Sequence, residues 1–161
     1  MKIKNKINVL LIGYGYWGPN LARNIDNSND YNLISICESN KKNFLEIKKT
    51  YPKVKILDDY KKAIIQNGIN LVVIATPTKT HYQIAKYALQ NDKHILVEKP
   101  ITQSLKELTS LYKIADKKKK EIFVDYPFLF SGASEYLKKI ISSDKYGKPY
   151  SLEFIREQAP I

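Results

Sequence analysis

Cysteine and long apolar runs are both scarce in this chain of 161 residues, and each absence narrows the class of protein. A single cysteine, Cys37, excludes a disulfide within the chain and favours a reducing cytoplasm. No apolar run approaches the roughly 18 residues that a membrane-spanning helix needs. The basic start is followed only by the short apolar stretch 7–12, without a small-residue cleavage site, so no signal peptide is expected. We therefore expect a cytoplasmic protein with no membrane partner.

Arginine is also rare, although the formal net charge is +11. A strongly basic chain can indicate a nucleic-acid partner, which would show as steep salt dependence of DNA binding. Only Arg23 and Arg156 are arginines, however, and arginine is the residue that grips phosphates and base edges bidentately. The excess charge comes from lysine, alongside many Asn, Ile and Tyr residues, a joint bias typical of an A/T-rich coding sequence. We expect no nucleic-acid partner.

Short apolar runs typical of buried strands alternate with segments that have helical spacing and caps. Strands are expected over 7–12, 31–37, 54–57, 71–75, 94–97 and 122–124, and helices over 17–25, 41–49, 58–66, 80–90 and 104–116. Such alternation indicates βαβ units and a parallel sheet. The predicted fold class is therefore α/β, a doubly wound parallel sheet covering residues 1–125.

The pattern changes after Asp125. An aromatic, irregular stretch precedes an expected helix over 133–142 and one further expected strand over 150–155. We interpret residues 126–161 as a crossover helix and the first strand of a truncated second α/β domain.

The sharpest motif is Gly13-Tyr14-Gly15-Tyr16-Trp17-Gly18, which directly follows the first expected strand and opens the first expected helix. In a G-x-G-x-x-G motif the first glycine makes a tight turn, the second lets a pyrophosphate approach the backbone, and the third lets helix and strand pack closely. The helix N-terminus offers free N–H groups to phosphates. The motif predicts a dinucleotide site; the simpler alternative is a glycine-rich turn without a ligand.

Glu38 closes the second expected strand, twenty positions after Gly18. An acidic residue there accepts hydrogen bonds from the adenosine ribose and repels a 2′-phosphate. NAD is therefore favoured over NADP as the cofactor, although Lys41 and Lys42 could meet a phosphate, and a solvated strand-end carboxylate is the simpler alternative.

Glu98-Lys99-Pro100 ends the fifth expected strand, at the edge where ligands bind in open α/β sheets. A lysine beside a positively charged nicotinamide ring should lose its proton more easily and could take a proton from a substrate hydroxyl. His81, at the start of a helix, is more often a packing or capping residue than a catalyst, so we place it beside the cofactor. No Cys/His cluster indicates a metal site.

Three stretches, VLLIGYGYWG over 9–18, VIATPTKTH over 73–81 and HILVEKP over 94–100, together resemble the N-terminal half of the Gfo/Idh/MocA family of oxidoreductases. The resemblance implies a Rossmann domain and an NAD(P)-dependent dehydrogenase acting on a sugar, nucleotide-sugar or cyclitol, with a homo-oligomer at full length. It assigns the catalytic role to Lys99, and cofactor contacts to Gly13, Gly15, the backbone of Tyr16 and Trp17, Gly18, Glu38, Thr76, Pro77, His81, Glu98 and Pro100.

Members of that family carry a second domain with a further catalytic histidine, and they often have His-Thr where this chain has Tyr126-Pro127. Because this chain stops as that domain begins, we expect it to bind the cofactor and to be inactive alone. The alternative is a nucleotide-binding module without turnover, serving as an NAD sensor or a scaffold.

Overall fold

A computed structural model describes residues 6–153 and 155. The described residues form two units, divided between Asp125 and Tyr126. None of the helices among these residues is both long and apolar enough to cross a membrane.

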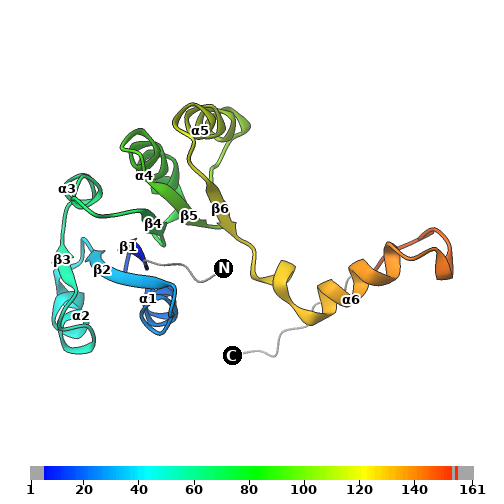
Figure 1. Ribbon diagram of the computed structural model, residues 1–161, viewed down its shortest axis with the longest axis horizontal. Coiled ribbons are helices and arrows are strands. Elements are labelled where there is room, and N and C mark those ends of the chain that lie inside the picture. Colours follow the sequence, from blue (N-terminus) through cyan, green and yellow to red (C-terminus); the bar gives the residue numbers. More distant parts are fainter. Residues whose placement is uncertain (1–5, 154, 156–161) are drawn as a thin grey trace. The chain divides into compact units, whose positions relative to one another are not determined.

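The first unit is built on one six-stranded parallel sheet (Figure 1). Its strands are β1 (Ile7–Ile12), β2 (Tyr31–Cys37), β3 (Lys55–Leu57), β4 (Leu71–Ile74), β5 (His94–Glu98) and β6 (Ile122–Asp125). Their order across the sheet is β3-β2-β1-β4-β5-β6, and every neighbouring pair is parallel. The order reverses between β1 and β4, and a sheet of this kind binds its ligand in the crevice at that point, beyond the carboxyl ends of the strands.

Helices cover both faces of the sheet, as a doubly wound fold requires (Figure 1). On one face lie α1 (Gly18–Asp26) and α2 (Phe44–Thr50), the latter preceded by a short 3-10 turn; on the other lie α3 (Tyr60–Ile64), α4 (Thr78–Gln90) and α5 (Leu105–Lys118). Two helix starts follow from capping residues: Asp59 accepts from the N–H groups of Lys61 and Lys62, and Ser104 accepts from that of Glu107.

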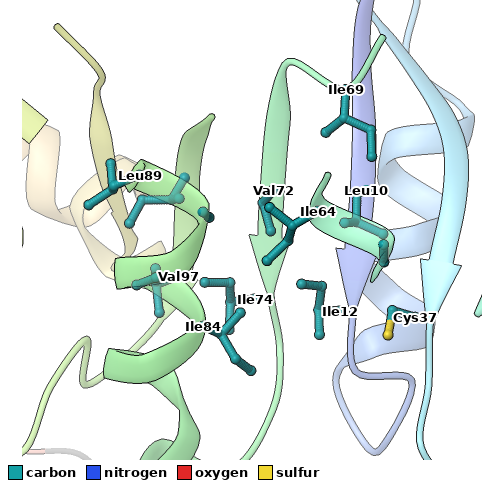
Figure 2. Packing of buried hydrophobic residues seen from close by; sticks show 14 of the residues in the cluster. Leu10, Ile12, Cys37, Ile64, Ile69, Val72, Ile74, Ile84, Leu89 and Val97 are labelled. Atoms are coloured by element: carbon teal, nitrogen blue, oxygen red, sulfur yellow. The ribbon is translucent and has the colours of Figure 1, made fainter. Parts of the chain in front are cut away.

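The core consists of two apolar layers, one on each face of the sheet. Strand β1 shows why: Leu10 and Ile12 pack into the layer under α3, α4 and α5, whereas Val9 and Leu11 pack into the layer under α1 and α2. Figure 2 shows the first layer, in which side chains of the central strands face those of α3 and α4. Because both faces are covered, the central strands read as continuous apolar runs. Each large aliphatic side chain fully buried in this way stabilises the fold by about 1.5–3 kcal/mol.

The second unit contains a 3-10 turn over Pro127–Phe130, helix α6 (Gly132–Ile141) and a further 3-10 turn over Asp144–Tyr146. The prediction of a strand over 150–155 was wrong in its described part. Residues 150–153 and 155 adopt no regular structure, and position 154 lies outside the described residues. A strand is stable only when a neighbour takes up its backbone hydrogen bonds. The described residues of this unit contain no strand that could do so.

Candidate functional site

The glycine loop joins β1 to α1, and its three glycines have different surroundings. Gly13 has φ +96°, and a Cβ there would lie 2.5 Å from the carbonyl oxygen of Ala75. A Cβ at Gly18 would overlap the carbonyl oxygen of Gly13. Only glycine fits at either position. Gly15 is exposed and has nothing within 4 Å of where its Cβ would stand, so its backbone is open to a ligand.

Glu38, at the carboxyl end of β2, is only 7% exposed, and its carboxylate holds two loops. Its Oε2 accepts from the backbone N–H of Tyr14 at 2.6 Å, and its Oε1 accepts from that of Asn40 at 2.6 Å. Charge-assisted bonds of this length are among the stronger hydrogen bonds in proteins. A carboxylate offers about four acceptor positions, so these two bonds leave Glu38 able to accept from a ligand hydroxyl.

A cavity of about 580 Å³ opens beyond the ends of β1, β2 and β4, where the strand order reverses. Of the residues expected at the site, its lining includes Gly13, Gly15, Glu38, Thr76 and Pro77. The lining also contains residues that the sequence did not predict at the site, among them Asp58, Tyr60, Lys79, Thr80 and Gln83. The position of Asp58 directly after β3 was a usable signal, because the ends of neighbouring parallel strands meet at one edge of a sheet.

Cys37 also lines this cavity, and its thiol is 4% exposed. Burial, reinforced by the nearby carboxylates of Asp59, Glu38 and Asp58, raises the pKa of Cys37 to about 12. The thiol is therefore protonated at neutral pH and acts here as a small apolar group.

His81 joins the loop after β4 to the loop after β5. The side chain is 1% exposed; its Nε2 lies 2.7 Å from the carbonyl oxygen of Thr76, and its Nδ1 lies 2.9 Å from that of Pro100. The Thr80 hydroxyl lies 2.7 Å from both the Thr76 hydroxyl and the Pro77 carbonyl oxygen. The loop that lines the cavity and the loop that carries Lys99 are thus held together.

Lys99 is exposed and follows β5 directly, in the turn that also contains Pro100. The residue before it, Glu98, is opposite Asp125 in the register of β5 and β6. Desolvation by burial, and then the charge of Asp125 and a hydrogen bond with it, raise the pKa of Glu98, while Lys99 acts in the opposite direction. Glu98, Lys99 and Pro100 are not among the residues that line the cavity.

Tyr16 and Trp17 form an exposed pair beside the glycine loop, with their rings stacked at a centroid distance of 6.3 Å. Their side chains and Gly18 lie outside the lining of the cavity. Within residues 6–153 and 155, no group of three or more His, Cys, Asp or Glu side chains is arranged to hold a metal ion.

The residues present fit a dinucleotide. The backbone at Gly15 is open, with nothing within 4 Å of where a Cβ would stand. Helix α1 begins three residues later, and the buried carboxylate of Glu38 lies at the end of the adjacent strand β2. These are the three parts by which a Rossmann unit binds diphosphate and ribose. The glycine loop and Glu38 would hold the group.

Comparison with known proteins gives a consistent family. The model for the oxidoreductase family with an NAD-binding Rossmann fold, GFO_IDH_MocA, matches residues 7–126. The scyllo-inositol 2-dehydrogenase (NAD(+)) of Bacillus subtilis (strain 168) is 30% identical over 162 aligned positions, covering 97% of this chain and 46% of that protein. The scyllo-inositol 2-dehydrogenase (NADP(+)) IolW of the same organism is 29% identical, over 70% of this chain and 31% of that protein.

Among solved structures, apo scyllo-inositol dehydrogenase from Lactobacillus casei has a TM-score of 0.83 over 89% of this chain and 43% of that one. At 20% identity this likeness concerns the fold alone. The chain spans less than half the length of each of these three proteins. The family model matches most of the chain, and the structure has the Rossmann fold that the family description gives. The chain therefore belongs to the Gfo/Idh/MocA family of NAD-binding Rossmann-fold oxidoreductases.

Proposed function

We propose that this chain is the cofactor-binding part of an NAD-dependent dehydrogenase that interconverts a secondary hydroxyl and a ketone on a sugar or cyclitol. The observation that carries the proposal is the cavity between the open Gly15 backbone and the buried Glu38 carboxylate, at the switch point of the sheet. The inositol dehydrogenases among the relatives support a polyol substrate.

The preference for NAD rests on Glu38. A 2′-phosphate on the adenosine ribose would meet its carboxylate, which two backbone N–H groups hold in a buried position. Like-charge repulsion and lost hydrogen bonds there would cost about 1–3 kcal/mol. Lys41, one of the two lysines that could meet such a phosphate, lies 3.5 Å from the Asp58 carboxylate. The relatives include both NAD- and NADP-dependent proteins, so cofactor choice is decided at the level of such side chains.

Lys99 is the proposed proton acceptor. A bound nicotinamide would supply hydride-accepting chemistry at the carbon that bears the hydroxyl. The hydroxyl proton would pass to the Lys99 side chain, so the substrate would lose one hydride and one proton and become a ketone. The bonds of His81 hold the loop that carries Lys99 against the loop after β4, whose residues Thr76 and Pro77 line the cavity.

Residues 126–161 are proposed to begin a second domain that supplies the substrate contacts. Without those contacts the reacting centre would be open to water, which weakens both substrate binding and electrostatic stabilisation. The chain as given would then bind NAD without measurable turnover.

The test of cofactor binding is calorimetric titration of the chain with NAD and with NADP. NAD should bind about 5- to 150-fold more tightly, which corresponds to the 1–3 kcal/mol above. Equal affinities, or tighter NADP binding, would remove the role given to Glu38.

The test of the reaction uses a chain extended by a second domain from a family member, with a panel of sugars and inositols. Lys99→Met should lower the turnover rate about a hundredfold to ten-thousandfold and leave NAD affinity unchanged. Lys106→Met, an exposed lysine on α5, is the matched control. NAD binding without turnover on any substrate would instead favour a nucleotide-sensing module.

A further inference from the structure

His81 is enclosed between two hydrogen-bond acceptors of the same kind. Its Nε2 is 2.7 Å from the Thr76 carbonyl oxygen and its Nδ1 is 2.9 Å from the Pro100 carbonyl oxygen. Both separations are ordinary for an N–H donating to a carbonyl oxygen. Since His81 is 1% exposed, water does not replace these carbonyl oxygens as partners of its ring nitrogens.

A neutral imidazole cannot satisfy this arrangement, because it carries a proton on only one of its two nitrogens. Whichever tautomer formed, the other nitrogen would direct a lone pair at a carbonyl oxygen less than 3 Å away. One of the two carbonyl oxygens would also lose the N–H donor that faces it.

We propose that both ring nitrogens of His81 donate, so that a buried imidazolium ties the Thr76 loop to the Pro100 loop. Two charge-assisted hydrogen bonds offset the desolvation of the ring. The charged residues within two positions of His81 or Pro100 along the chain are Lys79, Glu98 and Lys99. In the described part of the chain, the two ion pairs are Lys41–Asp58 and Lys118–Asp92, so His81 relies on the carbonyl oxygens.

The position of this link gives it a functional consequence, which rests on the function proposed above. Thr76 and Pro77 line the cavity, and Pro100 follows Lys99 directly. Because His81 bonds to both segments, it fixes the separation between the wall of the cofactor cavity and the proposed base. It is a positioning residue, acting through Thr76 and Pro100.

The chain contains an internal reference for the test, because His94 is its only other histidine. His94 Nδ1 accepts from the backbone N–H of Glu121 at 3.1 Å, so that nitrogen carries no proton and His94 is neutral. The two rings are therefore expected in opposite states within one molecule.

The experiment is a two-bond proton–nitrogen correlation spectrum of the nitrogen-15-labelled full chain at neutral pH, without cofactor. We expect one ring whose Nδ1 and Nε2 have nearly equal nitrogen-15 chemical shifts, as in an imidazolium. The other ring should have two widely separated nitrogen-15 shifts, as in a neutral tautomer. His94→Gln should remove only the neutral set, which assigns the other to His81. A His81 ring with one unprotonated nitrogen would overturn the proposal, whatever the cofactor result.

The positioning role is measured by NAD titration of His81→Gln, whose single amide cannot reproduce two N–H donors pointing in opposite directions. Provided that the variant keeps the native near-ultraviolet circular dichroism, NAD should bind at least tenfold more weakly than to the wild type and to His94→Gln. Unchanged affinity in a folded variant would overturn the positioning role. Absence of NAD binding to the wild type would instead contradict the proposed function and leave the spectroscopic result standing.

Discussion

At the scale of single residues, Glu38 shows how one side chain both holds a loop and lines a cavity. Its carboxylate accepts the N–H of Tyr14 from the glycine loop and the N–H of Asn40 from the turn after β2. The glycine loop is therefore held in place by a side chain that also faces the cavity. Any substitution that alters cofactor choice at this position also alters the loop.

Glu38→Gln should lower the free energy of unfolding by about 1–3 kcal/mol, because the amide nitrogen of Gln would face one of the two backbone N–H donors. Urea denaturation followed by circular dichroism measures the change. The control is Glu121→Gln, at an exposed carboxyl, which should stay within about 0.5 kcal/mol of the wild type. Equal stability of Glu38→Gln and the wild type would contradict the two-bond arrangement.

Cys37 predicts a specific response to alkaline pH. Burial raises the pKa of its thiol from 9.0 to about 12, so the unfolded chain ionises in a pH range where the folded chain stays protonated. The contribution of Cys37 to stability is thus complete below pH 9 and is lost as the pH rises towards 12. The free energy of unfolding of Cys37→Ala should therefore fall less steeply with pH over this range than that of the wild type. Burial also raises the pKa of Tyr14 to about 12, so part of the pH dependence remains in both proteins.

The same thiol should react slowly with iodoacetamide in the native state, since the thiolate is the reacting species. We expect labelling at pH 8 at least a hundredfold slower than in denaturant. Comparable rates in the two states would mean that Cys37 is neither buried nor protonated.

At the scale of elements, the sequence pattern predicted most of the first unit. Strands β1 and β2 have the predicted bounds, and α4 and β5 differ from prediction by two residues at most. This succeeded because the strands are short, largely apolar runs and because Asp59 and Ser104 cap two of the helices. The strand expected over 150–155 was wrong in its described part, because its apolar pattern says nothing of whether a neighbour exists.

Less of the candidate site than of the fold could be predicted from the sequence. The glycines and Glu38 were found because their spacing along the chain is itself informative. The contact of His81 with Pro100, the pairing of Glu98 with Asp125 and the place of Lys79 in the cavity wall depend on how separate loops meet. Local spacing does not contain that information.

The glycine loop makes two glycines separable by experiment. Gly18→Ala should destabilise the fold by several kcal/mol, because its Cβ would overlap the Gly13 carbonyl oxygen. Gly15→Ala should leave stability within about 1 kcal/mol, since nothing stands within 4 Å of the new methyl group, and should weaken NAD binding at least tenfold. Thermal unfolding and calorimetry provide the two measurements. Normal NAD binding by Gly15→Ala would exclude a phosphate from this loop.

At the scale of the whole first unit, the sheet is covered unevenly. On the face that carries α1 and α2, a hollow of about 540 Å³ lies over β4, β5 and β6, lined in part by Leu71, Leu96 and Phe123. Phe123 is 56% exposed and belongs to β6, an edge strand of the sheet. An apolar face beside an open strand edge favours association.

The chain is therefore expected to self-associate at high concentration, and Phe123→Ser should reduce this association with little change in stability. Sedimentation velocity at increasing concentration measures it. Tyr112→Ser, at an exposed aromatic on α5, is the control and should associate like the wild type. A wild-type chain that sediments as a monomer at every concentration would show that this face does not mediate self-association.

The bonds that hold the glycine loop have a consequence for how fast a ligand binds. Gly13 donates to the Cys37 carbonyl oxygen, Tyr14 donates to Glu38, and the Asn43 side chain donates to the Tyr14 carbonyl oxygen. Binding then has no loop to order, which avoids an entropic cost of ordering and a slow conformational step. Stopped-flow traces with NAD should follow a single exponential whose rate constant rises linearly with NAD concentration, without a plateau.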